Sequence, residues 1–179
     1  MKKLRFWLIL AAQISFAILI FMGASYWQEK DMLNVDSTIP VLSAVALDGK
    51  TYQIPASTSI ISRFTETADK KTLIYFFAPW CTVCHLSIGN LNILRGQLDE
   101  SELDIIIVAL DWKSKQEVEQ FISEHELDFP VLLGDIQWQQ QYKIKGFPSY
   151  YVIDHNGKVL SHSMGYSSSV GMLRRTLFN

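Results

Sequence analysis

One stretch, residues 73–90 (LIYFFAPWCTVCHLSIGN), constrains the fold more than any other part of the chain. Five strand-forming residues lead through Ala-Pro-Trp to Cys81 and Cys84, the only cysteines present, and an apolar pattern at helical spacing follows. A helix N-terminus carries partial positive charge and free N–H groups, so it stabilises a thiolate placed there. The stretch therefore predicts a strand that delivers a reactive C-x-x-C pair to the first turn of a helix.

The composition indicates one domain of ordinary size with an additional segment. The chain has 179 residues, of which 49% are hydrophobic and 19% charged, and its net charge is −2. Because there is no basic patch, nucleic acid is not expected as a partner. Two cysteines cannot form a disulfide framework, so the chemistry of the pair explains their presence better than bracing of the fold.

The additional segment lies at the N-terminus. Residues 1–5 are a basic end, and residues 6–27 contain no charged residue. That length fits one transmembrane helix, and the basic end predicts that residues 1–5 are cytoplasmic. Residues 28–39 are expected to be a linker to a domain at 40–179, outside a bacterial inner membrane in the periplasm. A cleaved signal peptide is the alternative, since Gly23-Ala24-Ser25 resembles a small-residue cleavage site.

The domain alternates strand and helix patterns. We expect strands at residues 41–47, 51–54, 60–64, 73–77, 105–110, 131–133, 149–153 and 158–164. We expect helices after Cys81, from Ser114, at 135–142, and after Ser167 or Ser168. Asp48-Gly49 and Asn156-Gly157 are strong turn signals. A β-α-β start and a β-β-α finish predict an α/β fold, with a mixed central sheet flanked by helices on both faces.

Helical spacing also predicts which side chains lie on the inner faces. They are Val83, Leu86, Leu91, Leu94 and Leu98 in the first helix, Val118, Phe121 and Ile122 in the second, and Val170, Leu173 and Leu177 in the last. Gly89 and Gly96 weaken the first of these helices and indicate a bend.

The order of motifs resembles a known fold. The strand, F-A-P-W-C-x-x-C and helix are followed about 60 residues later by G-F-P, Y-Y-V-I-D and N-G-K. Residues 38–179 are similar to thioredoxin-fold proteins. The N-terminal hairpin and the expected anchor resemble the TlpA-like branch of membrane-anchored thiol–disulfide oxidoreductases, and within it the ScsD-type proteins.

The resemblance implies roles for five residues. Cys81 is expected at the exposed helix N-terminus as the attacking thiolate, with Cys84 more buried as the resolving thiol. Pro148 matches the family's cis-proline beside the cysteines, where Phe147 presents its backbone to a substrate peptide and its bulk restricts access to the sulfurs. Trp80 is expected on the surface of the site.

Two positions depart from the family pattern. Tyr75 stands where many relatives have a buried acidic or amide residue used in proton transfer, and Ser87 stands where many have a glutamate. Asp111, expected at the end of a parallel strand, is a candidate replacement carboxylate, although a solvated aspartate is the more ordinary interpretation.

Two other site types compete with the redox pair. Cys81-Thr82-Val83-Cys84-His85 also spells C-x-x-C-H, the attachment motif of c-type haem, which makes an electron-transfer haem protein the alternative from another class. The preceding strand and the strand-rich chain count against it. A structural zinc site requires two more ligands, and we expect His125, His155 and His162 to be scattered and solvated. His85 itself is expected near the helix start.

These patterns lead to one expected activity. The chain is expected to exchange thiols and disulfides through Cys81 and Cys84, reducing protein disulfides, with a periplasmic disulfide oxidase of the same fold as the alternative. No diffusible cofactor and no metal are expected. The partners implied by the resemblance are protein disulfide or dithiol substrates and, for a reductase, a membrane electron donor of the DsbD or ScsB type.

Overall fold

The computed structural model describes residues 2–54, 70–99 and 101–178, and the strand predicted at 60–64 lies outside them. The chain divides into two compact units, Met1–Asp31 and Met32–Asn179. Each unit is described by itself below.

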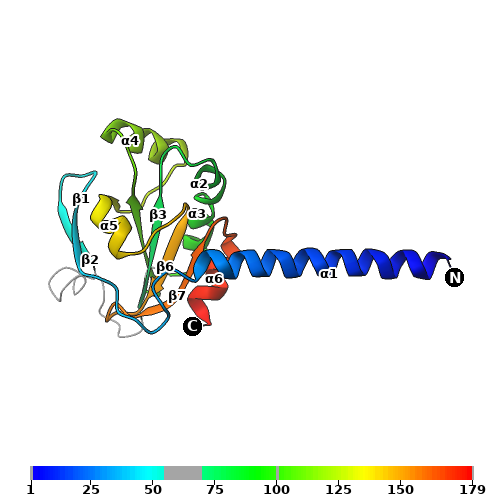
Figure 1. Cartoon of the computed structure of the whole chain (residues 1–179). Helices are drawn as coiled ribbons and strands as arrows, with labels where there is room; N and C mark the ends of the chain where they lie inside the picture. Colours follow the sequence, from blue (N-terminus) through cyan, green and yellow to red (C-terminus); the bar gives the residue numbers. More distant parts are fainter. Residues whose placement is uncertain (1, 55–69, 100, 179) are drawn as a thin grey trace. The chain divides into compact units, whose positions relative to one another are not determined.

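The first unit consists of one helix, α1 (Lys2–Glu29), which continues without interruption for 28 residues (Figure 1). Among the α1 side chains that the structure describes, the exposed large apolar ones are Phe6, Trp7, Ile9, Ile14, Phe16, Leu19 and Ile20. Among the residues that the structure describes, none of the helices meets the length and apolarity needed to cross a bilayer. The predicted membrane anchor is therefore not confirmed.

The second unit is built on one seven-stranded mixed sheet of order β2-β1-β5-β4-β3-β6-β7. The strands are β1 (Leu42–Ala46), β2 (Thr51–Ile54), β3 (Lys71–Phe77), β4 (Leu103–Ala109), β5 (Val131–Leu133), β6 (Ser149–Ile153) and β7 (Val159–Met164). β3, β4 and β5 run parallel to one another. On the other side of β3, β6 runs antiparallel to β3, and β7 runs antiparallel to β6. The predicted hairpin β1–β2 is confirmed, and it extends the sheet beyond β5.

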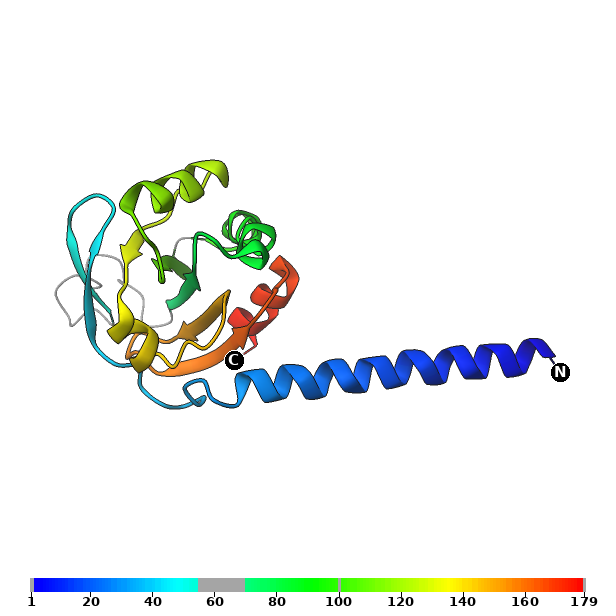
Figure 2. The ribbon, with the colours of Figure 1, turned by 45° about the horizontal axis from the view of Figure 1, so that its top comes forward.

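Helices cover both faces of this sheet, as predicted (Figures 1 and 2). The helices are α2 (Thr82–Ser87), α3 (Asn90–Arg95), α4 (Lys115–Glu124), α5 (Ile136–Gln141) and α6 (Ser169–Leu177). Because strand side chains alternate between faces, Tyr75 and Phe77 pack with α2, α3, α4 and α6, while Ile74 and Phe76 pack with α5. The central strand β3 is thus buried on both faces, which explains its continuous apolar sequence.

The segment before the hairpin belongs to this unit. Met32 and Ile39 are both 2% exposed, and Asp36 N donates to the carbonyl oxygen of Val159 at 2.8 Å. The compact domain therefore begins at Met32, inside the segment 28–39 that was expected to be a linker.

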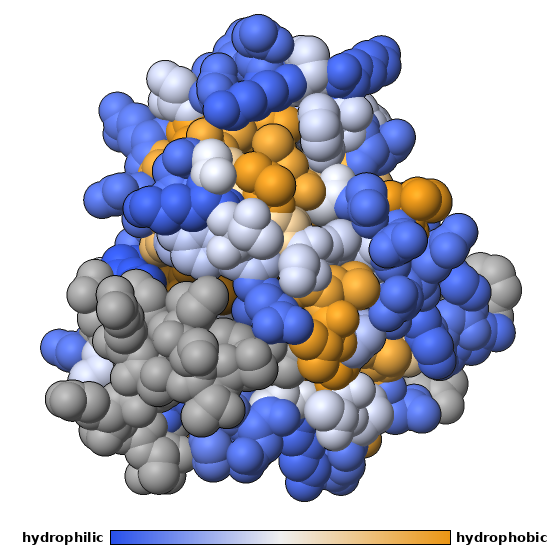
Figure 3. All heavy atoms as spheres, turned by 90° about the vertical axis from the view of Figure 1, so that its left-hand side faces the viewer, coloured by the Kyte–Doolittle hydropathy of each residue, from blue (hydrophilic) through white to orange (hydrophobic). Residues whose placement is uncertain are grey.

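On the side of the β1–β2 hairpin, hydrophilic side chains separate small hydrophobic areas (Figure 3).

The helix after Cys81 bends where its glycines predict, but its inner face differs from the prediction. The helix is interrupted at Ile88 and Gly89, between α2 and α3. The predicted inward positions of Val83 and Leu86 are wrong, since these side chains are 39% and 69% exposed. Cys84 faces inward instead, together with Ser87 and Ile88, and this buried stripe continues at helical spacing to Leu91. The prediction was wrong because it followed only the larger aliphatic side chains of the first turn.

The inner face of α6 also differs from the predicted one, whereas the inner face of α4 is the predicted one. Val170 and Leu177 are exposed, which contradicts the prediction, and Met172 and Thr176 are buried in their place. The Thr176 hydroxyl donates to the carbonyl oxygen of Met172 at 3.0 Å, so its polar group is satisfied inside. In α4 the predicted cap is confirmed, because Ser114 Oγ accepts from Glu117 N.

Candidate active site

The end of β3 places the two cysteines at the first turn of α2. Cys81 is the N-cap residue, with extended backbone angles, and its sulfur accepts a hydrogen bond from Cys84 N at 3.2 Å. A sulfur in this position satisfies one of the free N–H groups of the helix start. The predicted strand–cysteine–helix connection is therefore present, and both cysteines are free thiols.

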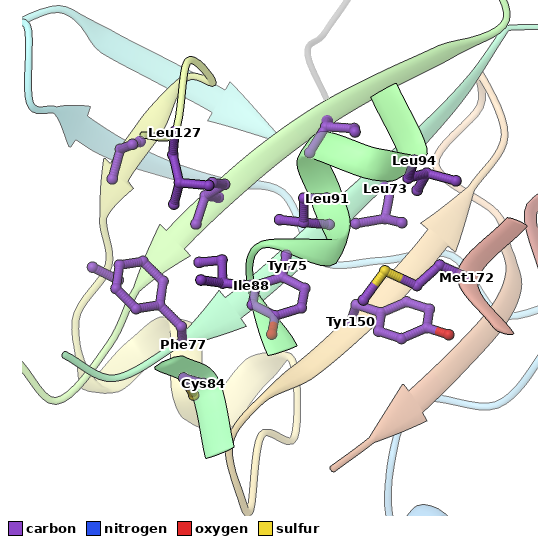
Figure 4. Packing of buried hydrophobic residues seen from close by; sticks show 14 of the residues in the cluster. Leu73, Tyr75, Phe77, Cys84, Ile88, Leu91, Leu94, Leu127, Tyr150 and Met172 are labelled. Carbon is purple, nitrogen blue, oxygen red and sulfur yellow. The ribbon is translucent and has the colours of Figure 1, made fainter. Parts of the chain in front are cut away.

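Cys84 lies one turn later, inside the core. Its side chain has no exposed surface and belongs to the cluster that contains Tyr75, Phe77 and Ile88 (Figure 4). Burial raises the pKa of the Cys84 thiol, and its hydrogen bond with Cys81 raises it further. Cys84 is thus held as a neutral thiol in the folded protein.

Cys81 is more accessible than Cys84, although less so than predicted. Its exposed fraction is 6%, so the prediction of an exposed residue is wrong. The Cys81 thiol donates to the carbonyl oxygen of Phe147 at 3.6 Å, and the Phe147–Pro148 bond is cis, as predicted. The G-F-P segment therefore lies against Cys81 and restricts access to its sulfur.

Trp80 forms the exposed border of the site. Its side chain is 55% exposed, and its ring packs edge-on against Phe147, with ring centroids 6.1 Å apart. Trp80 Nε1 donates to the backbone oxygen and to Oδ2 of Asp111, both at 3.1 Å. Asp111, two residues beyond the end of β4, is exposed but not merely solvated, since its carboxylate accepts a hydrogen bond from Trp80.

The two departures from the family pattern have different surroundings. The Tyr75 side chain is fully buried, and its hydroxyl has no hydrogen-bond partner among the described residues. Burial raises the pKa of Tyr75 strongly, so this hydroxyl is not a base at neutral pH. Ser87 is buried and bonds the backbone of Ser167 through its hydroxyl, which fixes the loop before α6.

His85 is paired with His125, which the sequence did not indicate. His85 Nδ1 lies 2.8 Å from His125 Nε2, and His85 Nε2 lies 3.0 Å from the carbonyl oxygen of Pro79. The predictions of solvated side chains are wrong for His125 and His162, which are both half-buried, while His155 is exposed. The fifth letter of C-T-V-C-H was the one available signal, and it identified His85 but not its partner.

The arrangement of the sulfurs supports two-step exchange chemistry. One cysteine borders the surface beside an exposed aromatic ring, and the second lies beneath it within one helical turn. A pair of this kind interconverts between a dithiol and an internal disulfide through a mixed disulfide.

Residues 48–162, more than half of the chain, match the family model described as AhpC/TSA family. The chain belongs to the AhpC/TSA family. The fold around the cysteines is the thioredoxin-like α/β fold expected from the motif order. A solved structure described as a putative thiol:disulfide interchange protein DsbE from Chlorobium tepidum has a TM-score of 0.65 and 21% identity, and the match covers 82% of this chain and 96% of that chain.

Curated relatives carry similar descriptions. The chain is 30% identical over 100 residues to the thiol-disulfide oxidoreductase ResA of Oceanobacillus iheyensis, covering 54% of this chain and 50% of that protein. It is 24% identical over 108 residues to the thioredoxin-like protein YneN of Bacillus subtilis, covering 58% of this chain and 62% of that protein. The chain thus spans between half and two thirds of the length of these relatives.

Proposed function

We propose that this protein is a thiol–disulfide oxidoreductase that reduces protein disulfides through Cys81 and Cys84. The observation that carries the proposal is the position of Cys81, at the start of α2 with its sulfur against the Phe147 carbonyl, above a fully buried Cys84. Relatives described as thiol-disulfide oxidoreductases support the same chemistry. Of the TlpA-like proteins, the ScsD type remains the proposed subgroup.

The reaction proceeds in two exchanges. The Cys81 thiolate attacks one sulfur of a substrate disulfide, forms a mixed disulfide and releases the other substrate sulfur as a thiolate. The sulfur of Cys84 then attacks Cys81 and expels the second substrate sulfur. The proton of Cys84 passes to the departing sulfur, because the raised pKa of Cys84 keeps that proton in place until the attack. The substrate gains two electrons, and the enzyme is left with a Cys81–Cys84 disulfide.

The border residues bind the substrate. Trp80 offers an exposed ring, and Phe147 and Pro148 offer backbone against which an extended peptide aligns. Two observations favour this dithiol chemistry over haem attachment. Cys84 has no exposed surface, and His85 Nε2 is directed at the Pro79 carbonyl.

The proposed location is the periplasmic side of a bacterial inner membrane. The support is the absence of charged residues from 6 to 27 and the continuous helix α1 that contains them. The basic residues before position 6 favour a cytoplasmic N-terminus. A membrane donor of the DsbD or ScsB type supplies the electrons in this proposal.

The test is insulin reduction by the full-length chain with dithiothreitol as the electron source. Cys81→Ser abolishes the activity, whereas reduced Cys84→Ser, incubated with insulin after dithiothreitol has been removed, accumulates mixed disulfides that a non-reducing gel resolves. Activity that persists in Cys81→Ser contradicts the assignment. A reduction potential of about −120 mV, as in the strong oxidant DsbA, would instead assign the protein to the oxidases.

A further inference from the structure

A second cluster of metal-ligating side chains lies beside the cysteine pair and takes no part in the proposed exchange. It joins His85, in α2, to Glu124 and His125 at the C-terminal end of α4 (Figure 1). One ligand atom from each of these three residues lies within 4.8 Å of the other two. We propose that His85, His125 and Glu124 form a binding site for a divalent transition-metal ion of the zinc type.

The hydrogen bonds of His85 prepare its ring for this role. The Pro79 carbonyl can only accept, so the proton of a neutral His85 is on Nε2 and the lone pair is on Nδ1. That lone pair points at His125 Nε2, 2.8 Å away. A backbone carbonyl behind a ligating histidine is the usual support of a metal-bound imidazole, because it fixes both the tautomer and the ring orientation.

The distances are close to those of a metal complex. Two nitrogens bound to one tetrahedral zinc ion at about 2.0–2.1 Å lie roughly 3.3 Å apart. The two rings therefore need to separate by only about 0.5 Å for an ion to replace the shared hydrogen. His125 then carries its own proton on Nδ1, so the exchange leaves both imidazoles neutral.

Packing holds the two rings in place. The ring of Phe121 contacts both imidazoles, with centroids 4.5 Å from His85 and 4.8 Å from His125. Phe121 is itself 2% exposed and stacks on Phe77, 4.5 Å away. Asn92 donates to the His125 carbonyl at 3.3 Å, which steadies the end of α4. A site formed on helices and supported by buried rings loses little entropy when it binds an ion.

The ligand set indicates which ion is bound. Two imidazoles and a carboxylate are borderline ligands that suit Zn²⁺, and three protein ligands leave a fourth position open. Glu124 is exposed, and one of its oxygens accepts from the Gln120 side-chain amide at 2.7 Å. In the proposed site the other carboxylate oxygen of Glu124 binds the ion.

The experiment uses the full-length chain without a histidine tag, oxidised so that Cys81 and Cys84 form a disulfide and offer no thiolate to the metal. Zn²⁺ is titrated against a chromophoric chelator. One equivalent is expected to bind, and His125→Ala and Glu124→Gln are expected to weaken binding at least about 10-fold. Both substitutions lie at the accessible end of α4, so the fold is retained, which circular dichroism checks.

His155→Ala is the matched control, because His155 is an exposed histidine whose Nε2 lies 2.9 Å from the side-chain nitrogen of the neighbouring Asn156. Its affinity for Zn²⁺ is expected to equal that of the unchanged chain. Bound Co²⁺ should show the visible bands of a tetrahedral ion without thiolate charge transfer. No uptake by the oxidised chain, unaltered affinity in His125→Ala, or equal loss in His155→Ala overturns the proposal.

Discussion

The sulfur of Cys81 lies 3.6 Å from the carbonyl oxygen of Phe147, a residue 66 positions later in the chain. This contact joins the start of α2 to the segment before β6, two parts that the sheet order places next to each other through β3. It also explains why Cys81 is only 6% exposed although it begins a helix at the surface. In the proposed reaction, a substrate disulfide approaches the sulfur between Phe147 and Trp80.

The first prediction concerns the unequal reactivity of the two thiols. In the reduced native protein, iodoacetamide should modify Cys81 at least about 10-fold faster than Cys84, because Cys84 is fully buried and its pKa is raised. Peptide mass spectrometry after timed labelling measures both rates. In guanidinium chloride the two rates should become equal. Equal rates in the native protein would show that the burial of Cys84 is lost in solution.

The second prediction follows from the raised pKa of Cys84. A thiol whose pKa is higher in the folded state stabilises the fold below the unfolded pKa, near 9, and that contribution is lost as the pH rises toward the folded value. Between pH 9 and 10 the free energy of unfolding should therefore fall by about 1 kcal/mol, and above pH 10 the slope should approach about 1.4 kcal/mol per pH unit.

Urea unfolding in the presence of a phosphine reductant measures this slope, and Cys84→Ala is the control. Because the variant lacks the titrating thiol, its stability should fall less steeply with pH by that amount. Parallel slopes in the two proteins would contradict a raised pKa at Cys84.

Local signals in the sequence predicted much of the fold. Asp48-Gly49 identified the hairpin, and Gly49 indeed has a positive φ of 82°. The cysteine motif and the G-F-P segment identified the two sides of the site. These features depend on residues near one another in sequence, or on a motif order specific enough to indicate the fold.

Features that depend on tertiary packing were not predictable in this way. The inner face of α2 was assigned to Leu86, because the prediction followed large aliphatic side chains, whereas the packing buries Cys84 and Ser87. The pairing of His85 with His125 joins residues 40 positions apart, and it arises from the packing of α4 beside α2. A histidine in the sequence does not indicate which side chain it will contact in the folded protein.

The third prediction concerns Asp111 as a positioning residue for Trp80. Asp111→Gly removes the carboxylate and suits the positive φ of 51° at this position. Trp80 Nε1 then keeps only the backbone acceptor, so KM for a protein disulfide should rise about 3- to 10-fold, as expected for one lost hydrogen bond, with kcat nearly unchanged. Asp111→Asn keeps an acceptor and should restore KM. An unchanged KM in Asp111→Gly would show that the hydrogen bond from Trp80 to the Asp111 carboxylate does not contribute to substrate binding.

The fourth prediction compares two glycines. A Cβ at Gly134 would lie 2.7 Å from Leu110 Cδ2 and 2.9 Å from Val108 Cγ1, and both neighbours are fully buried. Gly134→Ala should therefore lower the free energy of unfolding by about 1–3 kcal/mol. Gly89 has helical backbone angles and nothing within 4 Å of the added Cβ, so Gly89→Ala should raise stability by about 0.4–1 kcal/mol. Thermal unfolding of the two variants should shift in opposite directions, and a common direction would contradict this comparison.

The fifth prediction concerns the buried hydroxyl of Tyr75. Because this hydroxyl has no hydrogen-bond partner among the described residues, Tyr75→Phe should leave the free energy of unfolding unchanged or raise it by up to about 1 kcal/mol. The rate of thiol–disulfide exchange should stay within about twofold of that of the unchanged protein, since a hydroxyl with a strongly raised pKa supplies no base.

Tyr151→Phe is the matched control: the Tyr151 hydroxyl donates to the Tyr142 carbonyl at 2.7 Å and accepts from Leu33 N at 3.0 Å. The same substitution there should cost about 1–3 kcal/mol, because a buried donor and acceptor are left unpaired. Urea unfolding and insulin reduction measure the two effects, and a large loss of exchange rate in Tyr75→Phe would show that the hydroxyl takes part in proton transfer.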